Sequence, residues 1–462
     1  MSDYSAVFKC PGCGSPLEIQ EGTISLACTF CGLIMRLGSP GRILKYFYKT
    51  DLNDFGAKFS VEHYLKQKGR PLKYEKLDCR SFHLPFYRFR GMSYALLSEK
   101  TVTCDDDPEE PLIITKKTYI QKDRQFDLTV PAFGDESFGL DSLGIRPEVM
   151  PLTAFQKDIF PEDSTLVDID ISPEDAEREA MAMYFYNLGI AAANKECISS
   201  EMIGEGLSVI YYPVLAFTIG QQGMPSTVFI DGLNKRVYRE IPGALEYDSE
   251  RTDKSRAVEL DPVQHKCPNC GFDLPVSQVS LFYYCSNCDR SYVLKDDDYV
   301  SVELAISKYE DGNFHHPFWR FPFKAGDADK VGKFARLLTG EIPLVAKSKA
   351  ENEFYLYVPA FSASNLKSLT DLGVRLCRVQ PELNPETRSF SPAAEMILPE
   401  SEALELARFY WNVIRARYRH LLKSDFDFAS CTTEPGELIW LSLARRYASA
   451  SSPGIMKKVR YV

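Results

Sequence analysis

The sequence predicts an α+β protein with an internal duplication, in which each half has a four-cysteine metal site followed by a β-rich domain with one long helix. Three observations indicate this class: cysteine pairs recur at a fixed spacing, short aromatic strings recur in the same order, and a helix-type segment lies late in each half. The length of 462 residues suits a chain of several domains. With 45% hydrophobic and 26% charged residues, the composition excludes collagen-like, disordered and coiled-coil proteins.

The cysteines indicate metal binding. Eight of the thirteen form C-x-x-C pairs, with fourteen residues between the two pairs of each set. The expected ligands are Cys10, Cys13, Cys28 and Cys31 in the first set, and Cys267, Cys270, Cys285 and Cys288 in the second. Two pairs at this spacing supply a tetrahedral thiolate site, so we expect two structural zinc ions per chain. Iron remains an alternative because thiolate tetrahedra also hold iron, and unbound or disulfide-bonded cysteines are a third interpretation.

Turn-forming residues surround the cysteines. Pro11 and Gly12 lie between the first two ligands and Pro268 lies between the fifth and sixth, while Gly14 and Gly271 follow the second ligand of their pairs. This pattern resembles the zinc-ribbon family with its rubredoxin-like knuckles. The resemblance covers residues 10–31 and 267–288, and it implies that each set of four cysteines binds one zinc. Ribbons occur in transcription factors, ribosomal proteins, enzymes and adaptors, so the resemblance implies a metal and leaves the function open.

The other five cysteines follow no such spacing. They are Cys79, Cys104, Cys197, Cys377 and Cys431. We interpret them as ordinary reduced thiols, which indicates a reducing compartment. No leader-type segment or membrane span is expected, and the predicted location is cytoplasmic.

Recurring strings predict the duplication. Residues 82–89, 130–133 and 143–146 recur as 314–321, 358–361 and 372–375. Cys10 and Cys267 are 257 positions apart, whereas Phe82 and Phe314 are 232 apart, so the first half carries about 25 additional residues after its ribbon.

One helix and several strands are expected in each half. Ser172-Pro173-Glu174-Asp175 opens a helix that we expect to reach Lys195, and Pro399-Glu400 opens its counterpart. Strand-like runs follow at 207–217 and 438–444, and the clearest other strands are 112–115 and 354–358. The predicted limits are ribbon 1 at 1–42, domain copy 1 at 43–250, ribbon 2 at 262–297, domain copy 2 at 298–447 and a basic tail at 448–462.

The recurring Phe-His-x-Pro-Phe-aromatic-Arg-Phe strand has two interpretations. In the first, its aromatic residues alternate into a core. In the second, it forms a partner-binding surface of arginine and aromatic side chains. The candidate residues for that surface are His83, Tyr87, Arg88, Arg90, His315, Trp319 and Arg320.

No catalytic signature is present. The chain lacks a phosphate-binding loop motif, a G-x-S-x-G string and an H-E-x-x-H string. The acidic loop at 105–110 could bind a divalent cation, although such loops are usually only solvated. We therefore expect no enzyme activity and no small-molecule substrate.

The resulting functional hypothesis is a non-catalytic, zinc-stabilised scaffold or adaptor that binds other proteins. The chain is also similar to bacterial multi-ribbon proteins with proline-aromatic strands, on the ribbons and the string Tyr211-Tyr212-Pro213-Val214. Some of those proteins are linked to envelope-stress machinery. The alternative is a nucleic-acid-associated ribbon protein in transcription or translation. The net charge of −10 does not favour it, because binding to phosphates needs surplus Lys and Arg.

Overall fold

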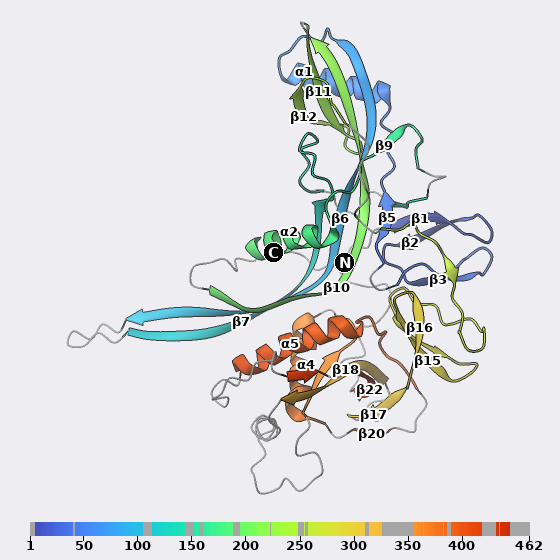
Figure 1. The fold of residues 1–462 in the computed structure, drawn as a ribbon, viewed down its shortest axis with the longest axis vertical. Helices are drawn as coiled ribbons and strands as arrows, with labels where there is room; N and C mark the ends of the chain where they lie inside the picture. Colours follow the sequence, from blue (N-terminus) through green and yellow to red (C-terminus); the bar gives the residue numbers. More distant parts are fainter. Residues whose placement is uncertain are drawn as a thin grey trace. The chain divides into compact units, whose positions relative to one another are not determined.

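The protein is a mixed α/β fold made mostly of strands, seen in a computed structural model (Figure 1). The structure describes residues 5–39, 42–104, 113–143, 152–156, 160–187, 195–221, 223–247, 254, 257–309, 314–325, 354–363, 365–381, 383–385, 390–417, 431–433 and 435–443. The acidic loop at 105–110 and the basic tail at 448–462 lie outside these residues. Among the described residues, no helix has both the length and the apolar character that a membrane span needs.

The chain forms two compact units. Unit 1 comprises Met1–Arg90, Asp127–Tyr184 and Gly206–His265, and unit 2 comprises Gly91–Phe126, Phe185–Glu205 and Lys266–Val462. Three long strands contribute residues to both units: β6 (Glu75–Cys104), β7 (Ile113–Pro131) and β10 (Lys195–Gln221). The domain limits expected from the sequence follow chain order, whereas the units exchange these segments; the limits stay a prediction.

A large sheet forms the core of unit 1. Its strand order is β12-β11-β10-β5-β8-β1-β2, and β6 pairs with β10, β7 and β9. The remaining bounds are β1 Ser5–Lys9, β2 Pro16–Gln20, β5 Leu44–Phe47, β8 Leu152–Ala154, β9 Ser164–Leu166, β11 Met224–Asp231 and β12 Val237–Pro242. A smaller sheet of ribbon 1 joins β3 (Ser25–Ala27), β4 (Ile34–Arg36) and β13 (Val263–Gln264). Alternation places Leu17 and Ile19 of β2 in the core and their neighbours in solvent.

Two helices belong to the first half. Helix α1 (Asp54–Gln67) begins after Asn53, whose side chain accepts a hydrogen bond from the amide of Gly56, and its buried stripe packs on β11 and β12. Helix α2 (Pro173–Asn187) begins where the sequence predicted, because the Ser172 hydroxyl accepts from the amide of Asp175. The described part of the helix reaches Asn187, residues 188–194 lie outside the described residues, and the expected end, Lys195, is the first residue of β10.

In unit 2, a second sheet and a second ribbon accompany two helices. The sheet order is β19-β18-β22-β17-β20, with β21 on β18, and ribbon 2 has the order β14-β15-β16. Helices α4 (Leu366–Val379) and α5 (Glu400–Arg417) pack on β19 (Figure 1). The strands are β14 Phe282–Cys285, β15 Arg290–Lys295, β16 Asp298–Val302, β17 Ala305–Lys308, β18 Phe314–Ala325, β19 Phe354–Pro359, β20 Asn384–Pro385, β21 Cys431–Thr433 and β22 Glu437–Leu443.

The expectation of one long helix per half is wrong. The described residues contain two helices in each half, and the sequence reasoning missed α1 and α4. Helix α1 buries only a narrow stripe of Ala57, Ser60, Val61 and Leu65, while aromatic side chains face outward and hide the helical period. Helix α4 does carry an apolar repeat, since Leu366, Leu369, Leu372 and Leu376 are buried at helical spacing, so its pattern was present in the sequence and was overlooked.

Corresponding strands of the two halves pair alike. Strand β5 pairs in parallel with β10, and β17 pairs in parallel with β22. The Ala132 amide donates to the Pro85 carbonyl at 3.0 Å, and the Ala360 amide donates to the Pro317 carbonyl at 2.9 Å. Most of the additional residues in the first half are α1 and the loops around it, between β5 and β6. The duplication itself stays a prediction.

Candidate metal centres

Each cysteine pair lies in a turn with the same backbone geometry. In each turn, the backbone amide of the residue directly after the second cysteine donates a hydrogen bond to the carbonyl of the first cysteine. These bonds run from Gly14 to Cys10 at 2.8 Å, Gly32 to Cys28 at 2.9 Å, Gly271 to Cys267 at 2.9 Å and Asp289 to Cys285 at 2.9 Å. The donor residue has a positive φ in all four turns, from 55° at Asp289 to 75° at Gly32. This left-handed conformation favours glycine, which explains three of the four residues. The sequence reasoning identified Gly14 and Gly271 and missed Gly32 and Asp289.

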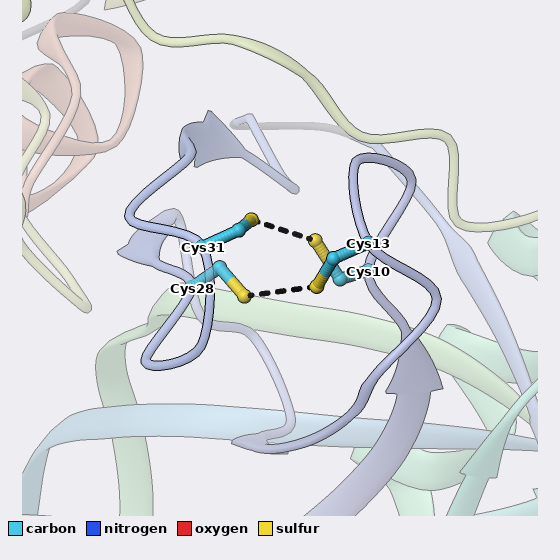
Figure 2. A group of neighbouring side chains, drawn as sticks. All are labelled: Cys10, Cys13, Cys28 and Cys31. Atoms are coloured by element: carbon cyan, nitrogen blue, oxygen red, sulfur yellow. Dashed lines mark hydrogen bonds between the residues drawn. The ribbon is translucent and has the colours of Figure 1, made fainter.

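The turns bring four sulfur atoms together in each ribbon. In ribbon 1 the Sγ atoms of Cys10 and Cys31, and those of Cys13 and Cys28, are 3.8 Å apart (Figure 2). In ribbon 2 the corresponding distances are 3.7 Å and 3.6 Å. All four Sγ atoms of a group lie within 4.8 Å of one another. A disulfide needs a separation of about 2.05 Å, so these thiols are not bridged in pairs.

The sulfur spacing fits a metal ion. A tetrahedral zinc with Zn–S bonds of about 2.3 Å separates its sulfurs by about 3.8 Å. The observed spacings agree with that edge length. The eight cysteines expected from the sequence are therefore brought together as two groups that could each hold one metal ion. Among the residues that the structure describes, no other group of three or more potential ligand side chains gathers in this way.

Local hydrogen bonds favour thiolates in both groups. Hydrogen bonds from the side chain and backbone of Ser15 lower the pKa of Cys13 to about 6. Burial opposes the charged form of Cys267, but the Tyr292 hydroxyl and nearby amides lower its pKa to about 6. Other thiols of the same groups shift the opposite way: despite a hydrogen bond from the Leu33 backbone, neighbouring thiols and burial raise the pKa of Cys31 to about 12, and burial raises the pKa of Cys285 to about 11. Each group therefore favours a thiolate at one cysteine, and a metal ion would displace the protons of the others.

The first turn of ribbon 1 is closely filled beside the sulfurs. A Cβ atom at Gly12 would lie 3.6 Å from Sγ of Cys31, 3.8 Å from Sγ of Cys10 and 3.1 Å from the side chain of Leu33. The first cysteine of each C-x-x-C pair is buried: Cys10, Cys28, Cys267 and Cys285. A metal ion held here would have four protein ligands and no open position for a substrate, which is the arrangement of a structural site.

One hydrogen bond distinguishes the two groups. In ribbon 2 the Tyr292 hydroxyl donates to Sγ of Cys267 at 3.4 Å. The residue 257 positions earlier, at the corresponding place in ribbon 1, is the buried Met35. Methionine has no proton to donate, so Cys10 has no equivalent of this hydroxyl bond from that position.

The ribbons are anchored to their own units by different interactions. In unit 1, Glu21 follows β2 and pairs with the guanidinium of Arg88, which also pairs with Asp127 at 2.5 Å. The Ser208 hydroxyl donates to Glu21 as well, and Arg88 and Glu21 are both buried. In unit 2 the ring centroids of Phe282, in ribbon 2, and Trp440 lie 4.9 Å apart. The Leu281 amide also donates to the Met396 carbonyl at 2.7 Å, and the Ser277 hydroxyl donates to Glu395 at 2.6 Å.

The residues expected to form a partner surface are mostly internal. Arg88 and Arg90 are buried, and Arg90 lies against Glu21. The Tyr87 hydroxyl donates to the Ile171 carbonyl, and the Trp319 indole donates to the Leu398 carbonyl. Burial with internal partners supports the packing interpretation of this strand, and partner binding there stays a prediction.

Arg320, the more exposed of the two motif arginines, also has partners within the protein. Arg320 pairs with Glu437 at 3.0 Å, and its guanidinium lies 3.5 Å from the ring centroid of Tyr355.

Both motif histidines, His83 and His315, are buried and form hydrogen bonds inside the protein. His83 is buried, its Nδ1 lies 2.7 Å from the Ser164 hydroxyl, and burial lowers its pKa to about 4. His315 is also buried, and its Nδ1 accepts from the Ser391 amide at 3.1 Å. A buried, hydrogen-bonded ring fits a structural role in each strand.

Three of the five scattered cysteines have described side chains. Cys79, Cys197 and Cys377 form no disulfide. The side chains of Cys104 and Cys431 lie outside the described residues.

Comparisons with protein-family models, curated proteins and solved structures find no match for this chain.

Proposed function

We propose that the protein is a non-catalytic adaptor in which two structural zinc ions stabilise ribbon lobes that bind other proteins. The observation that carries the proposal is the closed thiolate set in each ribbon. Structural zinc contributes folding free energy on the order of 10 kcal/mol per site near neutral pH. Zinc is favoured over iron because the ribbon spacing is the one found in zinc ribbons. A reducing, cytoplasmic location suits the thiols.

Exposed aromatic side chains on the knuckles favour protein binding. Phe30 lies between Cys28 and Cys31 and is 66% exposed, and Phe272 directly follows Gly271 and is 53% exposed. Each phenylalanine is carried on a turn whose backbone a metal ion would hold fixed. An exposed apolar side chain on a rigid support is typical of a docking point, because it is ordered before the partner arrives.

A capture experiment tests this proposal. The full-length, metal-loaded chain and its Phe30→Ser/Phe272→Ser variant are used as baits in nuclease-treated extract, and captured proteins are quantified by mass spectrometry. We expect a defined partner that the variant loses at unchanged zinc content, and that binds the purified wild-type chain directly. Equal capture by both baits would contradict docking at the knuckles.

The nucleic-acid alternative has less support from the geometry. It relies on the arginine-aromatic strands, yet Arg88 is buried and its charge is directed to Glu21 and Asp127. A guanidinium held between two carboxylates cannot neutralise a phosphate without losing its own partners. Steep salt-dependent binding of mixed DNA and RNA by the purified chain would favour that alternative instead.

We also propose that the two halves descend from one duplicated unit. The recurring hydrogen bonds support this relation, as do Tyr87 and Trp319, which occupy the same place in the motif and donate to carbonyls 84 and 79 residues later. An experimental structure tests it. Superposition of residues 10–215 on 267–445, apart from the α1 insertion and the exchanged strand segments, should match strand order and register; unrelated registers would contradict a duplication.

A further inference from the structure

Helix α1 belongs to an insertion that unit 1 carries and the second half lacks. Between β5 and β6 the chain runs from Tyr48 to Tyr74, whereas five residues separate β17 from β18. Figure 1 shows α1 beside β11 and β12, and its inner side chains pack against Leu215, Phe217 and Ile230. The inner face of the helix therefore accounts for its attachment to the sheet, and among the described residues the outer face packs against no other element.

The outer face of α1 carries two of the most exposed large apolar side chains among the described residues. Phe55 is 84% exposed and Phe59 is 70% exposed. They are four residues apart, so they are neighbours on one helix face, opposite to the buried stripe. Phenylalanine is a poorer helix former than alanine, so neither helix propensity nor packing explains these two residues.

The exposed apolar surface continues past the end of the helix. Arg70 donates to Oε1 of Gln221, at the end of β10, and the Gln221 amide group donates to the Pro71 carbonyl at 2.7 Å. These bonds hold the loop after α1 against the hairpin between β10 and β11. Leu72 on the loop is 54% exposed, and Met224 on the hairpin is 71% exposed.

This region is basic although the chain is acidic. Residues 54–76 contain six Lys or Arg and three Asp or Glu, in a chain with a net charge of −10. Two of the six cations are paired, Lys76 with Asp54 and Arg70 with Glu240. The other four, Lys58, Lys66, Lys68 and Lys73, have exposed side chains. Aromatic and aliphatic side chains surrounded by lysines are typical of elements that lie in a membrane interface.

We propose that the outer face of α1 and the adjoining loop and hairpin form a docking surface for an anionic lipid bilayer. Phe55 and Phe59 would enter the boundary between headgroups and acyl chains, with Leu72 and Met224 beside them at the loop and hairpin. The four lysines would extend to the lipid phosphates, since their alkyl stems can lie along the apolar side chains.

The charge argues against two other occupants. A second copy of the chain would bring the same basic face against itself, and like charges would oppose each other across a twofold contact. A nucleic acid would use the lysines but would leave Leu72 and Met224 without a contact surface. An anionic bilayer uses both the apolar and the basic residues.

Vesicle co-sedimentation tests the proposal with the full-length, zinc-loaded protein. The vesicles are phosphatidylcholine alone and phosphatidylcholine mixed with phosphatidylglycerol. We expect binding to the anionic vesicles that weakens with salt, and little binding to the neutral ones. Phe55→Ser/Phe59→Ser should weaken binding by about tenfold or more, because each phenylalanine that enters the interface removes apolar surface from water. Lys58→Ser/Lys66→Ser should reduce the preference for anionic vesicles.

The matched control is Phe30→Ser/Phe272→Ser, which replaces two other exposed phenylalanines and should leave vesicle binding unchanged. All these side chains are exposed, so thermal unfolding should match that of the wild type. Equal binding to both vesicle types, no binding, or no effect of the Phe55/Phe59 change would overturn the proposal. So would light scattering that shows a dimer which the same change dissolves. This test is independent of the partner capture described above.

Discussion

The two ribbons show which parts of a small four-cysteine lobe are fixed by local chemistry and which vary. All four knuckles use the same amide-to-carbonyl hydrogen bond and the same left-handed residue. The attachments differ: in ribbon 1, β1 pairs with β8 of the large sheet and Glu21 forms a buried pair with Arg88, whereas in ribbon 2 Phe282 contacts the ring of Trp440 and Leu281 donates to the Met396 carbonyl. The thiolate site dictates its backbone locally, whereas any well-matched contact can attach the lobe to its sheet.

The largest effect is expected from removing a ligand. Cys13→Ser and Cys270→Ser should each lower the zinc content from two ions to one and should lower the free energy of unfolding by several kcal/mol, since three thiolates hold zinc poorly. Elemental analysis and thermal unfolding measure both effects. The control is Cys197→Ser, an exposed thiol outside both groups, which should retain two ions. Wild-type protein with less than one zinc per chain would contradict the assignment of both sites.

Substitutions at Arg88 and Trp440 should both lower the free energy of unfolding, but only the loss at Arg88 should be recovered by a second substitution. Arg88→Met leaves the Glu21 carboxylate buried without its main partner and should cost about 3–5 kcal/mol of unfolding free energy. Adding Glu21→Gln should recover much of that cost, because the stranded charge is then removed.

No second substitution should restore the stability that is lost at Trp440. Trp440→Ala leaves a cavity beside Phe282 and should also cost about 3–5 kcal/mol, with no second substitution at Phe282 that restores it. Urea unfolding of the single and double variants measures these values. If Arg88→Met and its double variant are equally unstable, the pair does not act as a charge-balanced anchor.

A smaller effect is expected in the exchange of metal. Tyr292→Phe removes only the hydroxyl that donates to Cys267, so zinc should leave ribbon 2 faster, by about tenfold, with little change in fold stability. Competition with a coloured chelator would resolve this as one faster phase out of two. Met35→Leu is the control at the corresponding position of ribbon 1, and it should leave both phases unchanged. A Tyr292→Phe protein with wild-type release would show that the hydroxyl does not influence the metal.

The sequence predicted the parts of the molecule that local chemistry determines. The eight cysteines, the turns at Gly14 and Gly271 and the start of α2 follow from residue types at short spacing. The sequence reasoning missed what depends on tertiary contact. The charge of Arg88 suggested a surface, but the buried Glu21, 67 positions earlier, places it inside.

The same limit applies to α1. Its outward phenylalanines obscure the helical pattern of its buried stripe, so the helix is visible only once β11 and β12 are seen to cover the opposite face. The exchange of the segments Gly91–Phe126 and Phe185–Glu205 into unit 2 also has no local sequence signal.

The smallest expected effect tests the left-handed residue that the four knuckles share. Gly271→Ala should cost about 1 kcal/mol in the zinc-loaded protein, because its φ of +73° is unfavourable for a side chain although no atom lies within 4 Å of the added Cβ. Asp289→Gly relieves the same backbone cost but loses the 2.7 Å hydrogen bond from the Tyr284 hydroxyl, so it should be nearly neutral. Thermal unfolding of both variants separates conformational cost from packing, since neither site is crowded. A neutral Gly271→Ala together with a strongly destabilising Asp289→Gly would mean that side-chain bonds, and not backbone conformation, determine the knuckle.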